Sequence, residues 1–176
     1  MVIIENFATS NEVAKLLLKA QSVKWGEFNP NNFWKNRIYD NLKDKEIATL
    51  TQSLLIRIQK VIINNSSYNE IYPDCCNIVR WEAGYEMQPH ADGENPDGSK
   101  HEMYWRKFGC ILYLNNDFDG GSIYFPNKDI ELKPKPGTLV FFPGTLEWLH
   151  GVKETKNGIR YNFATFWTDD KTRSIL

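Results

Sequence analysis

Hydrophobic residues recur at helical spacing in the first third of the chain. From Ser10 to about Gln21 the apolar positions fall on one face, with Ser10 or Asn11 suited to be the N-cap. A second pattern of the same kind runs over residues 42–63. We therefore expect two amphipathic helices within residues 1–65.

The pattern changes after Asn64. Short segments rich in aromatic and β-branched residues follow one another, separated by Gly, Pro, Asn and Asp: residues 76–83, 108–115, 121–126, 137–143, 146–152 and 159–167. This succession of short strands predicts an all-β barrel or sandwich with the helices packed on its outside. The longest break, residues 93–106, is a candidate lid or substrate loop.

Size and charge narrow the class of protein. A chain of 176 residues fits a single domain, and 21 basic against 22 acidic residues give a net charge of −1, which argues against nucleic acid as a partner. No run approaches about 18 consecutive apolar residues, and the first residues lack the pattern of a secretory signal. Three unevenly placed cysteines do not make a disulfide framework. We expect a soluble, cytoplasmic protein that does not enter membranes.

Two of the three histidines indicate a metal site. His90 and Asp92 are separated by one residue, so on an extended chain both side chains point to the same face, and His150 on another strand would complete the set. Two histidines and one carboxylate are the facial triad of non-haem Fe(II) oxygenases, which leaves coordination positions open. A structural zinc site would be closed, usually by cysteines in a CxxC spacing that this sequence lacks.

Arg160 indicates what would fill the open positions. If the segments around His150 and Arg160 form an antiparallel pair with a loop centred near Thr155, the two side chains share a face. A tight turn at 157–158 would instead separate them. A guanidinium set back from the metal suits a dicarboxylic co-substrate, whose distal carboxylate it binds through two parallel hydrogen bonds.

Six motifs in order then resemble a known family: HAD, CILYLN, DGGSIYFP, PKPGTLVFFPG, WLHGV and GIRYNFATFW. They look like the prolyl 4-hydroxylase-type branch of the Fe(II)- and 2-oxoglutarate-dependent oxygenases, over residues 75–168. The resemblance implies a double-stranded β-helix (a jelly-roll, cupin-like barrel) as the core, with residues 1–65 as its helical support, in one domain spanning 1–176.

The resemblance also implies roles for individual residues. His90, Asp92 and His150 match the iron ligands, Arg160 matches the partner of the distal carboxylate of 2-oxoglutarate, and Tyr113 matches a tyrosine that contacts the same carboxylate. The sequence departs from the family's pattern at two positions, where aromatic pocket residues are common: Trp81 and Met87.

The implied reaction is hydroxylation of a substrate C–H bond. Fe(II) would use 2-oxoglutarate and O2 and release succinate and CO2, with ascorbate as a candidate reductant. We expect a prolyl residue in a protein or peptide as the substrate, with a free amino acid, small metabolite or nucleobase as alternatives. A non-catalytic metal-binding module and a zinc- or manganese-dependent hydrolase or isomerase are the competing classes. Three aromatic residues are candidate substrate contacts, against the simpler interpretation that they pack in the barrel: Tyr104, Trp105 and Trp167.

Overall fold

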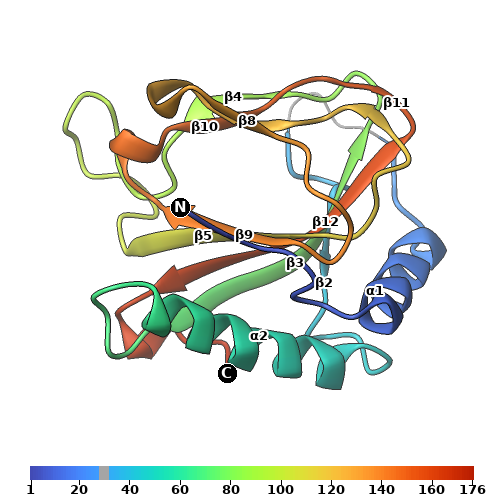
Figure 1. Cartoon of the computed structure of the whole chain (residues 1–176), viewed down its shortest axis with the longest axis horizontal. Helices are drawn as coiled ribbons and strands as arrows, with labels where there is room; N and C mark the ends of the chain where they lie inside the picture. The colour runs from blue at the N-terminus through green and yellow to red at the C-terminus, as the bar shows by residue number, and fades with distance from the viewer. Residues whose placement is uncertain (28–31) are drawn as a thin grey trace.

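The computed structural model of the chain describes residues 1–27 and 32–176. Its strands form antiparallel sheets that face each other, with the helices below and beside them (Figure 1). The larger sheet has the order β1 (Val2–Ile4), β9 (Leu139–Pro143), β5 (Arg106–Tyr113), β12 (Ile159–Thr168), β3 (Tyr72–Glu82), β2 (Ile38–Asp40). The smaller sheet has the order β4 (Met87–His90), β10 (His150–Val152), β7 (Ile123–Phe125), β8 (Ile130–Leu132). The predicted jelly-roll class is confirmed.

Several short elements lie between or after these strands. Strands β6 (Asp119–Gly120) and β11 (Thr155–Asn157) pair with each other, and three single turns of 3-10 helix follow strands: η1 (Pro126–Lys128), η2 (Leu146–Trp148) and η3 (Lys171–Arg173). No helix among the described residues is long and apolar enough to cross a membrane. The three cysteines are free thiols.

The two helices cover the outer face of the larger sheet (Figure 1). Apolar residues of α1 (Ser10–Ser22) and α2 (Ala48–Asn64) form one buried cluster with residues of β3, β5, β9 and β12. Within the helices this cluster includes Leu16, Leu54, Leu55 and Ile58, all fully buried. Burying such a face is what stabilises a helix whose intrinsic propensity alone is marginal. The inner face of the sheet is left for the site.

Strand β12 contributes side chains to both faces of the larger sheet. Residues alternate along a strand, so Phe163 and Trp167 point into the helix-covered core while Arg160 and Phe166 face the space between the sheets. The same period places Trp81 of β3 directly beside Arg160 across the β12–β3 pair. The apolar core and the candidate site are therefore built from opposite sides of one strand.

Both helix starts differ from the sequence-based expectation. The N-cap of α1 is Thr9, not Ser10 or Asn11: its hydroxyl accepts the Glu12 amide, and the Glu12 carboxylate accepts the Thr9 amide in return. Helix α2 begins at Ala48, several residues after the predicted start at 42. Side chains of Asp40 and Asp44 accept backbone amides of residues 42 and 46, which holds this stretch in turns.

The predicted pairing of the segments around His150 and Arg160 is wrong. Strand β10 pairs with β4 and β7 in the smaller sheet, whereas β12 pairs with β3 and β5 in the larger one. Between them the chain is held by β6 and by the turn after β3, where the Thr155 amide donates to the Tyr85 carbonyl and the Gly84 amide to the Thr155 carbonyl. The segment therefore crosses between the sheets, and His150 and Arg160 line the same pocket from different sheets.

Candidate metal centre

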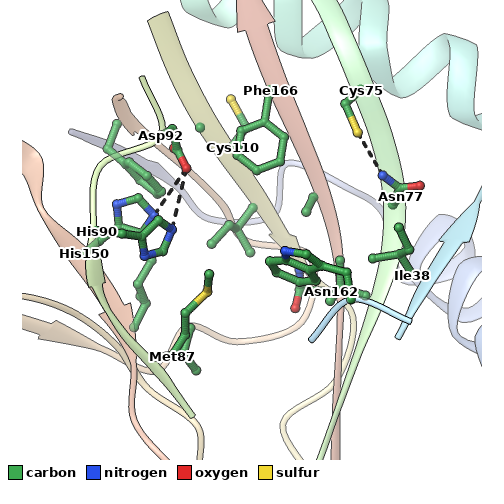
Figure 2. A pocket seen from close by; sticks show the side chains of 18 of the residues that line it. Ile38, Cys75, Asn77, Met87, His90, Asp92, Cys110, His150, Asn162 and Phe166 are labelled. Atoms are coloured by element: carbon green, nitrogen blue, oxygen red, sulfur yellow. Dashed lines mark hydrogen bonds and ion pairs between the residues drawn. The ribbon is translucent and has the colours of Figure 1, made fainter. Parts of the chain in front are cut away.

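Two histidines and one aspartate converge at one end of the barrel. His90 ends β4, His150 begins β10, and the two are register partners in the smaller sheet. Asp92 follows β4, and its Oδ1 lies 3.8 Å from the Nε2 atom of each histidine. One ligand atom from each residue lies within 4.8 Å of the other two. Figure 2 shows the three side chains pointing toward one another at the wall of a pocket.

Backbone carbonyls fix which ring nitrogen faces the centre. The Nδ1 atom of His90 lies 3.1 Å from the Gln88 carbonyl, and that of His150 lies 3.2 Å from the Trp148 carbonyl. An Nδ1–H donating to these oxygens leaves each Nε2 unprotonated, with its lone pair toward Asp92, as a metal ligand requires. Burial lowers the pKa of His150, and the nearby charge of Asp92 only partly opposes this effect. The neutral form of His150 is therefore favoured.

Glycines make room for the carboxylate. A Cβ atom on Gly109 of β5 would lie 2.5 Å from Asp92 Oδ2 and 2.9 Å from the Phe142 ring. One on Gly93 would lie 2.5 Å from the Arg106 carbonyl. The Asp92 side chain is 4% exposed, and its Oδ2 has no hydrogen-bond partner in the described chain. A buried, uncompensated carboxylate oxygen is costly, which fits a cation as the missing partner.

A buried arginine lies in the same pocket. Arg160 is 1% exposed, and Nε, Nη1 and Nη2 all lack hydrogen-bond partners among residues 1–27 and 32–176. Its guanidinium carbon lies 5.3 Å from the ring centroids of both Trp81 and Tyr113. The Tyr113 hydroxyl is buried and also without a partner in the described part. Burial lowers the pKa of Arg160 and raises that of Tyr113.

The inner face of the larger sheet forms the pocket floor. From Arg160, successive inward positions of β12 are Asn162, Ala164 and Phe166. Asn162 accepts the Trp81 indole N–H at 3.0 Å. The metal-ligand wall, this floor and Arg160 enclose a cavity of about 340 Å³. One pocket therefore contains the three candidate ligands and the candidate co-substrate arginine.

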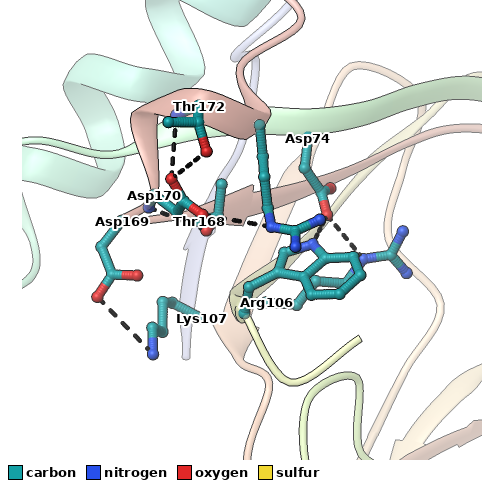
Figure 3. Close-up of polar contacts among 9 residues, drawn as sticks. Asp74, Arg106, Lys107, Thr168, Asp169, Asp170 and Thr172 are labelled. Atoms are coloured by element: carbon teal, nitrogen blue, oxygen red, sulfur yellow. Dashed lines mark hydrogen bonds and ion pairs between the residues drawn. The ribbon is translucent and has the colours of Figure 1, made fainter. Parts of the chain in front are cut away.

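A second cation lies at the other end of the floor. Arg106 lines the pocket, its guanidinium lies 3.8 Å from the centre of the Phe166 ring, and its Nε donates to Asp74 at 3.1 Å. Figure 3 shows this pair beside the 3-10 turn at the end of the chain, where Thr172 contacts Asp170. The Asp74 contact fixes Arg106 while leaving its two terminal nitrogens for other groups.

The predicted aromatic substrate contacts do not line the pocket. Trp167 is fully buried in the helix-covered core, because it lies on the opposite face of β12 from Phe166, and its indole donates to Thr165. This placement contradicts its assignment to the substrate wall. The Trp105 indole donates to Asp74 at 2.6 Å and stacks with Arg173, and Tyr104 is 46% exposed on the loop between β4 and β5. That loop borders the pocket through Met103 instead.

Several pocket residues were not anticipated from the sequence. The two-residue period of a strand places Asn162 and Phe166 on the face of Arg160, so that pattern gave a usable signal for both. Arg106, at the start of β5, and Gly109 carried no such signal, because their roles depend on which strands lie opposite. Trp81 and Met87, the two departures from the family pattern, both line the pocket.

The residues present fit an iron ion with a dicarboxylate beside it. Neutral imidazoles and a carboxylate with open positions are ligands suited to Fe(II), and Asp92 Oδ2 has no hydrogen-bond partner among the described residues. The three nitrogens of Arg160 and the Tyr113 hydroxyl, likewise without hydrogen-bond partners there, suit an anionic carboxylate in a buried site. The fold and the site together define a non-haem metal centre of the oxygenase type on a jelly-roll barrel.

Comparison with known proteins gives the family. Residues 76–169 match the model of the 2OG-Fe(II) oxygenase superfamily, and the chain belongs to this family. The family is named for Fe(II) and 2-oxoglutarate as its metal and co-substrate, and the cluster of His90, Asp92 and His150 fits such a metal. The triad predicted from the sequence lies inside the matched region.

The relatives and similar structures include prolyl hydroxylases. Human prolyl 3-hydroxylase 1 is 40% identical over 75 residues, which are 40% of this chain and 10% of that protein, so the chain spans about a tenth of this relative. A viral collagen prolyl hydroxylase from Paramecium Bursaria Chlorella virus-1, in complex with 2-oxoglutarate, has a TM-score of 0.68 at 20% identity, covering 97% of this chain and 96% of that one. A Trichoplax adhaerens prolyl hydroxylase in complex with a hypoxia inducible factor peptide fragment has a TM-score of 0.61 at 21% identity, covering 98% and 84%.

Proposed function

We propose that this chain hydroxylates a prolyl residue in a protein or peptide, using Fe(II) held by His90, Asp92 and His150 and 2-oxoglutarate held by Arg160 and Tyr113. The observation that carries the proposal is the buried Arg160, whose guanidinium forms no hydrogen bond or ion pair within the described residues and lies in the same cavity as the triad. A metal-dependent hydrolase would need the three ligands but no dedicated cation for a co-substrate.

Each residue has a defined task in this proposal. The triad would hold the metal and leave coordination positions open to other ligands. Arg160 and Tyr113 orient the distal carboxylate, so that the other end of 2-oxoglutarate reaches the metal. When bound there, iron would supply the oxidation, in which one atom of O2 enters succinate as 2-oxoglutarate loses CO2 and the other atom enters the prolyl C–H bond. The apolar walls, including Phe142 beside His150, exclude bulk water.

Support for a peptide substrate comes from the relatives and the pocket mouth. The relatives compared above are named as prolyl hydroxylases, and one structure holds a peptide. In this chain the end of the floor away from Arg160 presents Phe166 and Arg106. An aromatic wall suits a pyrrolidine ring, and a guanidinium suits a backbone carbonyl of an extended peptide.

The test measures succinate formation by anaerobically iron-loaded protein after exposure to O2, with and without a panel of proline-containing peptides and with and without ascorbate, the proposed reductant. We expect peptide to stimulate turnover, with a mass increase of one oxygen on proline. We expect His150→Ala to lose metal binding and Arg160→Ala to require far more 2-oxoglutarate. Turnover unchanged in both variants would disprove the site assignment.

A free amino acid is the second candidate substrate, and Arg106 is the observation that favours it. Its terminal nitrogens are not committed to Asp74, so they suit an α-carboxylate. The same assay with free amino acids, including proline, separates the two candidates. Stimulation by free amino acid and none by peptide would replace the peptide proposal.

A further inference from the structure

Arg37 is a second buried guanidinium without a carboxylate partner. It lies just before β2, is 2% exposed, and its guanidinium carbon lies 4.0 Å from the ring centroids of Phe33 and Tyr85 and 4.5 Å from that of Trp81. Its Nε and Nη2 atoms have no hydrogen-bond partner in the described chain, and Nη1 reaches only the Phe33 carbonyl, at 3.4 Å. We call Arg37 with Phe33, Trp81 and Tyr85 the Arg37 cage.

The Arg37 cage shares a side chain with the co-substrate end of the pocket. The guanidinium of Arg160 lies 5.3 Å from the Trp81 ring that Arg37 also contacts. The two guanidinium carbons are therefore no farther apart than the sum of these two distances, 9.8 Å. Trp81 itself lines the pocket and is fixed by its hydrogen bond to Asn162.

No acidic side chain balances these two cations. Across residues 1–27 and 32–176, neither Arg37 nor Arg160 forms an ion pair, and the sequence of residues 28–31 contains no Asp or Glu. Burial lowers the pKa of Arg37 to about 10, partly offset by Tyr85, so Arg37 keeps its charge at neutral pH. Two unpaired buried charges are expensive to keep close together. A packing role alone would be served better by an apolar side chain, and cation–π contacts only partly offset the cost.

We propose that Arg37 is the second cation of the co-substrate pocket, which raises affinity for the dianionic 2-oxoglutarate through its field across Trp81 without touching the ligand. The inference rests on the proposed role of Arg160. The distal carboxylate would bind at Arg160, whose guanidinium carbon lies no more than 9.8 Å from that of Arg37. Over a distance of this order in a buried region, a single charge changes binding by about tenfold. Arg37 is thus a positioning and charge-selecting residue, and the direct contacts belong to Arg160 and Tyr113.

The test compares two acids that differ by one charge. Calorimetry on Mn(II)-loaded protein gives the dissociation constants of 2-oxoglutarate, a dianion, and 2-oxobutyrate, a monoanion without the distal carboxylate. The variants are Arg37→Lys, which keeps the charge, and Arg37→Met and Arg37→Gln, which remove it. Arg57→Met is the matched control, because Arg57 also stacks on an aromatic ring, Phe7, but pairs with Glu12 on α1 outside the pocket.

We expect the two uncharged variants to bind 2-oxoglutarate about tenfold more weakly than the wild type and 2-oxobutyrate less than threefold more weakly. Their affinity for Mn(II) should be unchanged. Arg37→Lys and Arg57→Met should remain within threefold of the wild type for both acids. If the affinities for both acids fell equally, or if Arg37→Lys and Arg37→Met lost the same affinity for 2-oxoglutarate, Arg37 would have only a packing role. Either result would overturn the inference. Absence of 2-oxoglutarate binding by the wild type would refute the proposed function first, and the inference with it.

Discussion

At the scale of single residues, Gly109 is the position where the smallest change should affect the metal. In Gly109→Ala the new Cβ atom would lie 2.5 Å from Asp92 Oδ2 and 2.9 Å from the Phe142 ring, so the carboxylate must move. We expect affinity for Mn(II) or Fe(II) to fall by about tenfold or more. A small displacement of the Asp92 carboxylate is enough to spoil the arrangement of the three ligands, even though the fold persists. Calorimetric titration with Mn(II) measures this.

The control for this prediction is Ile111→Val on the same strand. It removes one methylene from the pocket floor, at a cost of about 0.5–1.5 kcal/mol, without approaching Asp92. Metal affinity that falls equally in both variants would show that strand stability, and not the space beside Asp92, controls the site.

The sequence was sufficient to identify those site residues whose side-chain chemistry alone indicates a metal or co-substrate site. His90, Asp92, His150 and Arg160 have side chains that are rarely buried without a partner, and the structure brings all four into one pocket. Gly109 could not be identified as a neighbour of the ligands, because the space beside it matters only once Asp92 is placed there, and Asp92 comes from the loop after β4.

At the scale of elements, the start of α1 makes a direct test. Thr9→Ala removes the hydroxyl that accepts the Glu12 amide and leaves that donor unsatisfied. We expect a loss of about 1 kcal/mol in the free energy of unfolding, measured by urea denaturation. Ser10→Ala is the matched control, since Ser10 is already inside the helix and should change stability by less than about 0.5 kcal/mol. The opposite order of the two variants would make Ser10 the cap.

Strand existence could be predicted at this scale, but strand pairing could not. Alternating and β-branched residues correctly indicated β3, β5, β9 and β12. The partner of β10 was missed because neighbours in sequence are the default expectation for a pair. Here Gly120 and Gly158, both with positive φ, allow the chain around residues 153–158 to pass close to other backbone and change sheets. Such close approach is visible only once both sheets are present.

For the whole molecule, metal binding should stabilise the fold, because the ligands come from β4, β10 and the loop after β4. A metal at about 100 times its dissociation constant adds about 2.7 kcal/mol to the free energy of unfolding. For a domain of this size that corresponds to a rise in Tm of roughly 5–10 °C. Thermal denaturation with Mn(II) and after EDTA measures the shift. An equal shift in His150→Ala would place the stabilising metal elsewhere.

Acid should loosen the junction between α1 and the edge of the larger sheet. Asp44, 7% exposed in its side chain, contacts Lys19 of α1 at 2.7 Å and the Tyr39 hydroxyl of β2. Burial alone would raise the pKa of Asp44, but the hydrogen bonds from Lys19 and Tyr39 outweigh it and lower the pKa to about 2. Because the folded value lies below the unfolded one, this contribution is complete above about pH 4 and is lost as the pH falls through 2. Wild type should therefore be more stable than Asp44→Asn at pH 6, and the difference should shrink toward pH 2 in urea titrations. Glu5→Gln, at an exposed carboxylate, is the control variant. A wild-type advantage that persists undiminished at pH 2 would mean that the ionised carboxylate is not what joins the helix to the sheet.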